Sequence, residues 1–252
     1  MDLTTIGGLV IGLGAIATAY LIEGGNMSAV TQLSPMLLVI GGTFGAATIS
    51  TSLRTIANIP KFLRIAFVGR SHNTRETIER IVRLSEKARR EGVLGLEEDM
   101  KRVDDPFFRK ALQLVIDGTE VTSIRQIMET EVQCITERHL SGIGLFKSLG
   151  GFSPTLGIIG TVLGLIHALS NTSQADKMAS AIAGAFIATL WGIGMANLCY
   201  LPIGDKLRLR HEQEVLEYEV ITEGVVAIQS GDNPRMIRTH LMSFMAPESR
   251  GE

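Results

Sequence analysis

Four stretches of the chain are long enough and apolar enough to form membrane helices. Two of them, 150–170 and 179–203, contain no Asp, Glu, Lys or Arg. The other two, 3–22 and 35–53, are separated by the turn-forming sequence Glu23-Gly24-Gly25-Asn26. A bilayer core takes about 20 apolar residues in helical form, and a backbone in lipid must satisfy its own hydrogen bonds. The pattern therefore predicts four transmembrane helices.

The segment between the second and third spans has a different pattern. Ile78, Ile81, Val82 and Leu84 recur with a helical period among charged residues, and a similar stretch runs over 107–116. Turns are expected where glycines or an Asp-Pro pair interrupt the pattern: Gly92, Gly95, Asp105-Pro106 and Gly118. No strand-length run of β-branched residues competes for a core.

After the fourth span, residues 205–228 read as a further charged helix. The turn at 230–234 then leads to a short final helix. The expected fold class is all-α, a polytopic membrane protein with four transmembrane helices and a helical cytoplasmic domain. The chain is expected to divide into a first transmembrane hairpin (1–53), a cytoplasmic helical domain (54–149), a second transmembrane hairpin (150–203) and C-terminal cytoplasmic helices (204–252).

The distribution of basic residues predicts the orientation in the membrane. Of the 24 Lys and Arg residues, only Lys177 lies outside the middle segment and the C-terminal tail. Because Lys and Arg accumulate on the cytoplasmic side, the middle segment and the tail are expected there. The short loops 23–34 and 171–178 then face outward. Both termini lie in the cytoplasm.

Composition narrows the class of protein further. The chain has 252 residues, 45% of them hydrophobic, a net charge of −2 and a mean hydropathy of +0.24. These values suit a membrane protein with a sizeable soluble part, and no basic footprint for nucleic acid is present. Cys134 and Cys199 lack disulfide or metal-ligand spacing and are expected to be buried small apolar residues. No phosphate loop or nucleophile–base pair supports an enzyme.

Small residues recur along the last two spans and predict close helix contacts. The third span has one stripe of Ser153, Gly157 and Thr161 and, on an adjacent face, a second stripe of Gly160, Gly164 and Ala168. The fourth span has a single stripe at four-residue spacing, Ser180, Gly184, Ala188, Gly192 and Ala196. Tight packing alone would explain the glycines and alanines. Pro154 and Pro202 are expected to bend or end their helices, and such a bend could act as a hinge.

These two spans offer little that could carry an ion. His167, near the outer end, is the only titratable candidate and is more typical of an interfacial residue. Thr161 and Thr189 supply hydroxyl oxygens that could line a cation path, but each could equally bond a carbonyl of its own helix. Any carboxylate that carries the ion must therefore come from another chain.

Several segments of this chain resemble the flagellar stator family of MotA, with its sodium-type relatives PomA and MotP. The resemblance is carried by 152–165 (FSPTLGIIGTVLGL), the Leu201-Pro202 pair, 227–235 (AIQSGDNPR), 88–97 (ARREGVLGLE) and the 23–26 turn. It extends over essentially the whole chain. The resemblance implies a protein of the bacterial inner membrane that forms a homo-oligomer, which is a pentamer in that family. The homo-oligomer is expected to surround two copies of MotB or of a PomB- or MotS-type partner.

The resemblance also implies roles for particular residues. The partner supplies the ion-binding Asp, which agrees with the missing acid, and Pro154 and Pro202 match the prolines that couple ion passage to conformational change. Arg89, Arg90, Glu97 and Glu98 match charged positions that meet the rotor protein FliG, although an ordinary solvated helix face would look the same. No metal or cofactor is expected, only transported H⁺ or Na⁺.

The choice of ion and two other functions stay open. Threonines at 161 and 189 are typical of sodium-type members, but proton-driven ExbB and TolQ proteins also carry one threonine. An ExbB- or TolQ-like energiser would have three spans, and the predicted N-terminal hairpin argues against it. In a passive membrane scaffold, the prolines and threonines would serve packing only.

Overall fold

The computed structural model describes residues 3–68 and 73–249, which contain helices and no strand. These residues divide into two compact units. The first unit comprises 3–68 and 139–209, and the second unit comprises 73–138 and 210–249. Helices α9 (Val121–Leu169) and α11 (Leu201–Gln229) contribute to both. The expected all-α class is confirmed.

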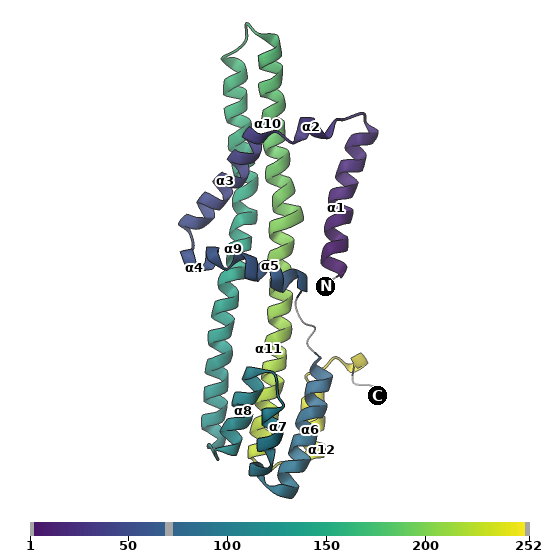
Figure 1. Ribbon diagram of the computed structural model, residues 1–252, viewed down its shortest axis with the longest axis vertical. Coiled ribbons are helices and arrows are strands. Elements are labelled where there is room, and N and C mark those ends of the chain that lie inside the picture. The colour runs from purple at the N-terminus through teal and green to yellow at the C-terminus, as the bar shows by residue number, and fades with distance from the viewer. Residues whose placement is uncertain (1–2, 69–72, 250–252) are drawn as a thin grey trace. The chain divides into compact units, whose positions relative to one another are not determined.

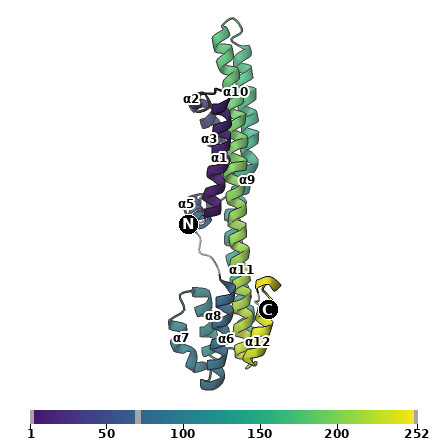
Figure 2. The ribbon, with the colours of Figure 1, turned by 90° about the vertical axis from the view of Figure 1, so that its right-hand side faces the viewer.

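The first unit is built around the antiparallel pair formed by the second half of α9 and by α10 (Ala175–Met195) (Figure 1). Helix α3 packs directly on α10. Figure 2 shows α1 and α3 along the same side of the α9–α10 pair. The remaining elements are α1 (Leu3–Ile22), α2 (Met27–Val30), α3 (Leu33–Ile49), α4 (Leu53–Ala57) and α5 (Ile59–Val68).

The first predicted span coincides with α1, whereas the second differs in its bounds. Helix α3 ends at Ile49, and the Ser52 hydroxyl then accepts a hydrogen bond from the Thr55 N–H to begin α4. A serine at the N-cap satisfies one of the unpaired N–H groups of a new helix. The segment that follows α3 therefore turns into α4 and α5, which belong to the first unit although they lie beyond residue 53. The predicted domain division stays a prediction.

The fourth predicted span does not end at Pro202. Helix α10 runs through a π-helical turn, Ala196–Tyr200, directly into α11, so one helix extends over Ala175–Gln229. A proline ring clashes with the carbonyl four residues earlier, here that of Leu198. The wider π turn accommodates the ring without ending the helix. The predicted helix over 205–228 is present within α11, but it continues from α10 instead of starting after a break.

Three helices in the described residues are long and apolar enough to cross a membrane: Leu3–Ile22, Val121–Leu169 and Ala175–Gln229. Helix α3 is a shorter apolar helix of 17 residues. Helix α1 has no buried residue, and its Ile11 and Ile22 side chains are 73% and 80% exposed. An apolar helix without a buried face needs lipid or another chain around it.

The core of the first unit lies where α5 and the end of α3 meet α9 and α11. Its buried side chains are Ala47, Ala66, Ile143, Leu145, Phe146, Leu149, Tyr200, Ile203 and Leu207. Gly142 makes this contact possible, because a Cβ there would lie 2.8 Å from the Phe62 ring. The α5 helix is therefore held against α9 by its aromatic side chains.

The second unit is a bundle of helices closed by α11. Its other elements are α6 (Thr74–Glu91), a 3₁₀ turn (Val93–Leu96), α7 (Glu97–Lys101), α8 (Pro106–Ile116), the first part of α9, α12 (Pro234–Met242) and a 3₁₀ turn (Pro247–Ser249). The predicted helices over 78–84 and 107–116 and the final short helix are all present. Asn73, Asp105 and Asn233 cap α6, α8 and α12 with side-chain oxygens.

Helix α11 fits closely into this bundle. A Cβ on Gly224 would lie 2.6 Å from the Ile81 Cγ2 atom, so a glycine lets α11 approach α6. The rings of Phe107 and Tyr218 stack with centroids 4.1 Å apart. The buried core includes Ile78, Ile81, Leu112, Val115, Ile124, Met128, Ile221, Ile237 and Leu241.

The prediction that both cysteines are buried was wrong for Cys134. This side chain is exposed, and Cys199 is only half-buried. On this part of α9 the buried positions are Ile124, Met128 and Ile135. Residue 134 precedes Ile135 by one position and therefore points about 100° away from the buried face.

Candidate functional site

Helices α9 and α10 touch backbone to backbone in the middle of the first unit. A Cβ on Gly192 would lie 2.8 Å from the Ser153 carbonyl oxygen and 2.9 Å from the Gly157 Cα atom. A Cβ on Gly164 would lie 3.0 Å from the Ala185 Cα atom. The predicted small-residue stripes therefore do form a helix contact. Gly184 is the exception, because it faces Gln32 and Pro35 instead.

Ser153 joins the two helices at their closest approach. Its side chain is fully buried, and its hydroxyl donates a hydrogen bond to the Gly192 carbonyl oxygen at 2.9 Å. Interhelical bonds of this type stabilise packed membrane helices by about 0.6 to 2 kcal/mol. From the sequence, Ser153 was expected only to be part of a packing stripe. A serine within an apolar span was the signal for this bond.

The structure brings the two predicted ion-pathway threonines together. The hydroxyls of Thr161 on α9 and Thr189 on α10 are in hydrogen-bond contact. The Thr161 Oγ1 atom also lies 3.1 Å from the carbonyl oxygens of Gly157 and Ala185. The Thr161 hydroxyl is thus in contact with one hydroxyl and two carbonyl oxygens, in a half-buried position between apolar helices. Oxygen atoms of this kind suit a hard cation or a proton path.

The two predicted pathway prolines lie on segments that touch each other. Pro154 is inside α9, and its ring leaves the Gly150 carbonyl without its usual helical donor. A Cβ on Gly150 would lie 2.4 Å from the Leu201 Cδ2 atom, which places the turn before Pro154 against the turn of Pro202. Pro154 is half-buried, whereas Pro202 is exposed. Both irregular turns therefore share one packing contact.

The four predicted rotor-facing residues are exposed and lie on either side of one turn of the second unit. Arg89 and Arg90 end α6, and Glu97 and Glu98 begin α7. Glu97 accepts a hydrogen bond from Lys101 at 2.9 Å, which raises the pKa of that lysine. Basic residues at a helix C-terminus and acidic residues at an N-terminus also complement the helix dipoles. Local helix stability alone would account for this pattern.

A partly exposed ion pair joins two helices of the second unit. The Arg125 guanidinium contacts the Glu223 carboxylate with both terminal nitrogens, the Nη2–Oε2 distance being 2.9 Å. His240 lies 3.9 Å from the same carboxylate. The hydrogen bond from Arg125 holds the pKa of Glu223 below its ordinary value. This pair links α9 to α11 within the unit.

Two known protein families match the chain and define the class of protein to which it belongs. Residues 99–220 match the MotA/TolQ/ExbB proton channel family, and residues 6–92 match the motility protein A N-terminal family. The threonine pair and the close α9–α10 contact thus lie in the part of the chain that is shared with a family of membrane proton channels.

Individual relatives cover almost the whole chain. Motility protein A of Borreliella burgdorferi is 35% identical over 252 residues, which are 100% of this chain and 97% of the relative. The structure of C. jejuni MotAB matches with a TM-score of 0.93 and 33% identity, over 98% of this chain and 97% of that one. The flagellar MotAB stator complex from Bacillus subtilis matches with a TM-score of 0.92 and 33% identity, over 99% and 98%. The chain belongs to the motility protein A family.

Proposed function

We propose that this chain, a stator subunit of the bacterial flagellar motor, forms with a MotB-type partner the ion pathway along α9 and α10. The carrying observation is the contact between the Thr161 and Thr189 hydroxyls, which lie in two apolar spans, 150–170 and 179–203, that contain no carboxylate. The partner supplies the ion-binding Asp. Several copies of this chain, five by analogy with the family, surround the partner.

The transported ion is H⁺ or Na⁺, and no covalent chemistry is assigned to the chain. An ion that binds the partner's aspartate neutralises it, and the neutral acid loses its preference for a polar contact. The neighbouring α9–α10 pair then presents its hydroxyls to the next acid. Each elementary charge that crosses 100 mV releases about 2.3 kcal/mol, enough to shift a two-state contact by more than tenfold.

The prolines couple this step to movement. Pro154 and Pro202 interrupt the hydrogen bonding of α9 and α11 at turns that touch through Gly150 and Leu201. Turns with fewer backbone bonds bend at lower cost than regular helix. A change at the threonine pair can therefore alter the angle of the helix segments that continue into the second unit.

Arg89, Arg90, Glu97 and Glu98 are the surface that meets the rotor protein, FliG in this family. All four are exposed on one turn-linked pair of helices. Exposed charges steer and orient a partner, while each pair contributes only about 0 to 1 kcal/mol. Charge reversal at these positions is therefore expected to weaken coupling to the rotor without changing ion flow.

The chain lies in the inner membrane with four spans, formed by α1, α3, the apolar end of α9 and α10. Helix α3 is about 25 Å long at 1.5 Å per residue, close to the thickness of the hydrocarbon core. Both termini then face the cytoplasm. Single cysteines in the 23–34 and 171–178 loops should react with a membrane-impermeant maleimide from outside, and cysteines in the second unit should not.

The test of function is swimming speed in a strain that lacks its own stators and receives this chain with its partner. External sodium is varied at fixed pH. Speed that follows sodium identifies Na⁺ as the ion, and speed that ignores sodium but falls with a protonophore identifies H⁺. Thr161→Val and Thr189→Val should reduce speed in either case, while Thr155→Val, whose hydroxyl bonds only its own helix, should not. Absence of motility under all conditions would contradict the proposal.

An ExbB- or TolQ-like energiser is disfavoured by the match of residues 6–92 to the motility protein A N-terminal family. The variant Pro154→Ala distinguishes a motor subunit from a passive scaffold. If the chain is a scaffold, this variant should assemble and work. If it is a motor subunit, the variant should assemble with its partner and stall.

A further inference from the structure

The α4–α5 segment of the first unit carries positive charge without any nearby acid on the same stretch of sequence. No Asp or Glu occurs between Glu23 and Glu76. Arg54, Lys61 and Arg64 lie in this interval, and all three side chains are exposed. Their side chains have no ion pair within the described residues, so these charges are directed to solvent or to a ligand.

Helix α5 is fixed with its cations turned away from the protein. Ala66 is fully buried, and Phe62, Leu63 and Ile65 pack against the core that includes Phe146. The polar face then presents Lys61 and Arg64, which are three residues apart. Side chains at this spacing are neighbours on a helix surface. An amphipathic helix with basic residues on its polar face is typical of a membrane surface.

A pocket of about 470 Å³ lies at the end of this basic row. It is formed by the start of α1, by Phe67 of α5 and by the turns around Pro202. Phe67 is three residues after Arg64, so the Arg64 side chain is a neighbour of Phe67 on the helix surface, although the pocket lining itself includes neither Arg64 nor Lys61. Its volume falls within the range of about 300–1,000 Å³ that is typical of ligand pockets.

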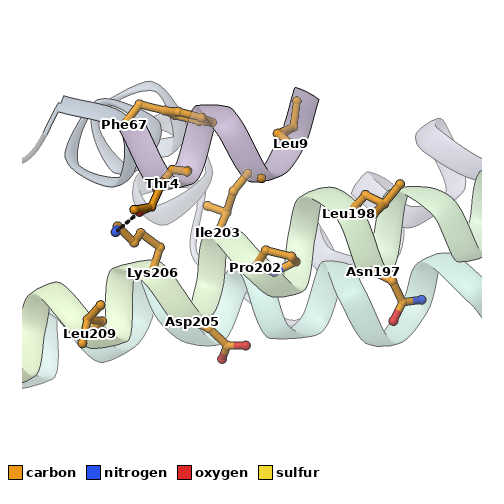
Figure 3. Close-up of a pocket in the computed structure, with 12 residues that line it drawn as sticks. Thr4, Leu9, Phe67, Asn197, Leu198, Pro202, Ile203, Asp205, Lys206 and Leu209 are labelled. Atoms are coloured by element: carbon orange, nitrogen blue, oxygen red, sulfur yellow. Dashed lines mark hydrogen bonds between the residues drawn. The ribbon is translucent and has the colours of Figure 1, made fainter. Parts of the chain in front are cut away.

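The pocket has a polar end and an apolar end. Figure 3 shows Lys206 and Thr4 at one end, where the Lys206 ammonium donates a hydrogen bond to the Thr4 hydroxyl at 3.5 Å. Leu9 and Leu198 lie at the other end, further along α1 and toward α10, where Asn197 also belongs to the lining but its side chain points away from Leu9 (Figure 3). The Asp205 carboxylate points away from Thr4 (Figure 3). Thr4 and Lys206 make this end of the pocket polar, and Asp205 adds an acidic residue to the same lining.

We propose that this pocket and the Lys61–Arg64 row together bind an anionic glycerophospholipid of the inner leaflet. An acyl chain occupies the apolar end beside Leu9 and Leu198, and the phosphate lies against Arg64 and Lys61. A guanidinium binds phosphate with two parallel hydrogen bonds. A lipid with net negative charge is favoured over a zwitterionic one, because the ammonium of the latter would meet like charges. The inference rests on the proposed orientation of α3, which brings α5 to the inner membrane surface.

Native mass spectrometry of the complex with its partner tests this directly. The purified complex is exposed to equal amounts of phosphatidylglycerol and phosphatidylcholine with identical acyl chains. Phosphatidylglycerol should remain bound in clear excess. Lys61→Gln with Arg64→Gln should lower its retention roughly 30-fold, since each basic residue contributes about fivefold at an anionic surface. Lys61→Arg with Arg64→Lys should preserve it. Lys101→Gln with Lys110→Gln is the charge-matched control and should have no effect.

The part of the pocket that would hold the acyl chain is tested with its own matched pair of variants. Gly8 lines the pocket, and a Cβ built on it meets nothing within 4 Å. Gly8→Leu should fill the pocket and lower retention of both lipids. Gly14→Leu, also on α1 with open space around its Cβ and outside the pocket, should not.

Three results would overturn the proposal: equal retention of the two lipids, an unchanged signal in Lys61→Gln with Arg64→Gln, or no effect of Gly8→Leu. If a second copy of the chain fills the pocket instead, no lipid is retained there and Gly8→Leu changes the subunit number in the spectrum. Because the readout is lipid mass and not rotation, a failure here leaves the ion-pathway proposal to its own test.

Discussion

Gly192→Ala should separate α9 from α10 and destabilise the first unit. The added methyl group would lie 2.8 Å from the Ser153 carbonyl oxygen and 2.9 Å from the Gly157 Cα atom. Both are backbone atoms, so no side chain can rotate away. An ordinary carbon–oxygen contact is about 3.3–3.6 Å, and the helices must therefore move apart by roughly 0.5 Å.

Overpacking of this kind costs about 1–3 kcal/mol. The control is Gly194→Ala, two residues further on, where a Cβ meets nothing within 4 Å. Both substitutions favour the helix by up to about 1 kcal/mol relative to glycine. The difference between the two variants thus isolates the contact with α9.

The assay is reversible unfolding in mixtures of mild detergent and dodecyl sulfate, followed by circular dichroism. Gly192→Ala should unfold at lower dodecyl sulfate than Gly194→Ala. Because the same contact holds Thr161 beside Thr189, Gly192→Ala should also reduce swimming speed in the stator-deficient strain. Equal stability of the two alanine variants would refute the close-contact argument.

Three other predictions follow from hydrogen bonds and an ion pair in the structure. Ser153→Ala removes the bond to the Gly192 carbonyl and should cost about 0.5–1.5 kcal/mol in the same unfolding assay, whereas Thr155→Ala, which loses only a bond within α9, should cost less. Glu223→Gln should cost about 1 kcal/mol or less at neutral pH, since both partners of the Arg125 pair are partly exposed. Because the pKa of Glu223 is lowered in the folded protein, the wild type should be more stable than Glu223→Gln at pH values above the ordinary pKa of 4.5. This difference in stability should disappear as the pH falls from 4.5 through the lowered pKa, which thermal unfolding at pH 7 and below pH 4 can check. Trp191→Phe removes the bond from the indole N–H to the Val30 carbonyl at 2.8 Å, so hydrogen exchange should rise over residues 27–32, and an unchanged rate would contradict that role.

Local features of the sequence were enough to predict most helices. The first span, the amphipathic helices α6 and α8, and the turn before α12 follow from periodicity, capping residues and glycines, which act within a few residues. The bounds of α3 and the effect of Pro202 on its helix were harder to predict. Ser52 caps a new helix at once, and the π turn over Ala196–Tyr200 absorbs the proline ring, so in each case a neighbouring turn altered the expected boundary.

The candidate site divides in the same way. Thr161 and Thr189 could be chosen from the sequence because hydroxyls are conspicuous in apolar spans that lack acids. That they touch each other, that Ser153 bonds across to Gly192, and that Gly150 meets Leu201 depend on how two helices are rotated and spaced. The exposure of Cys134 and the pocket beside Phe67 depend on the same arrangement. The sequence alone therefore determined which segments are helical and which residues carry polar groups, because helical periodicity is local. Only the tertiary structure decided which of these groups meet, because a contact between two helices depends on the packing of both.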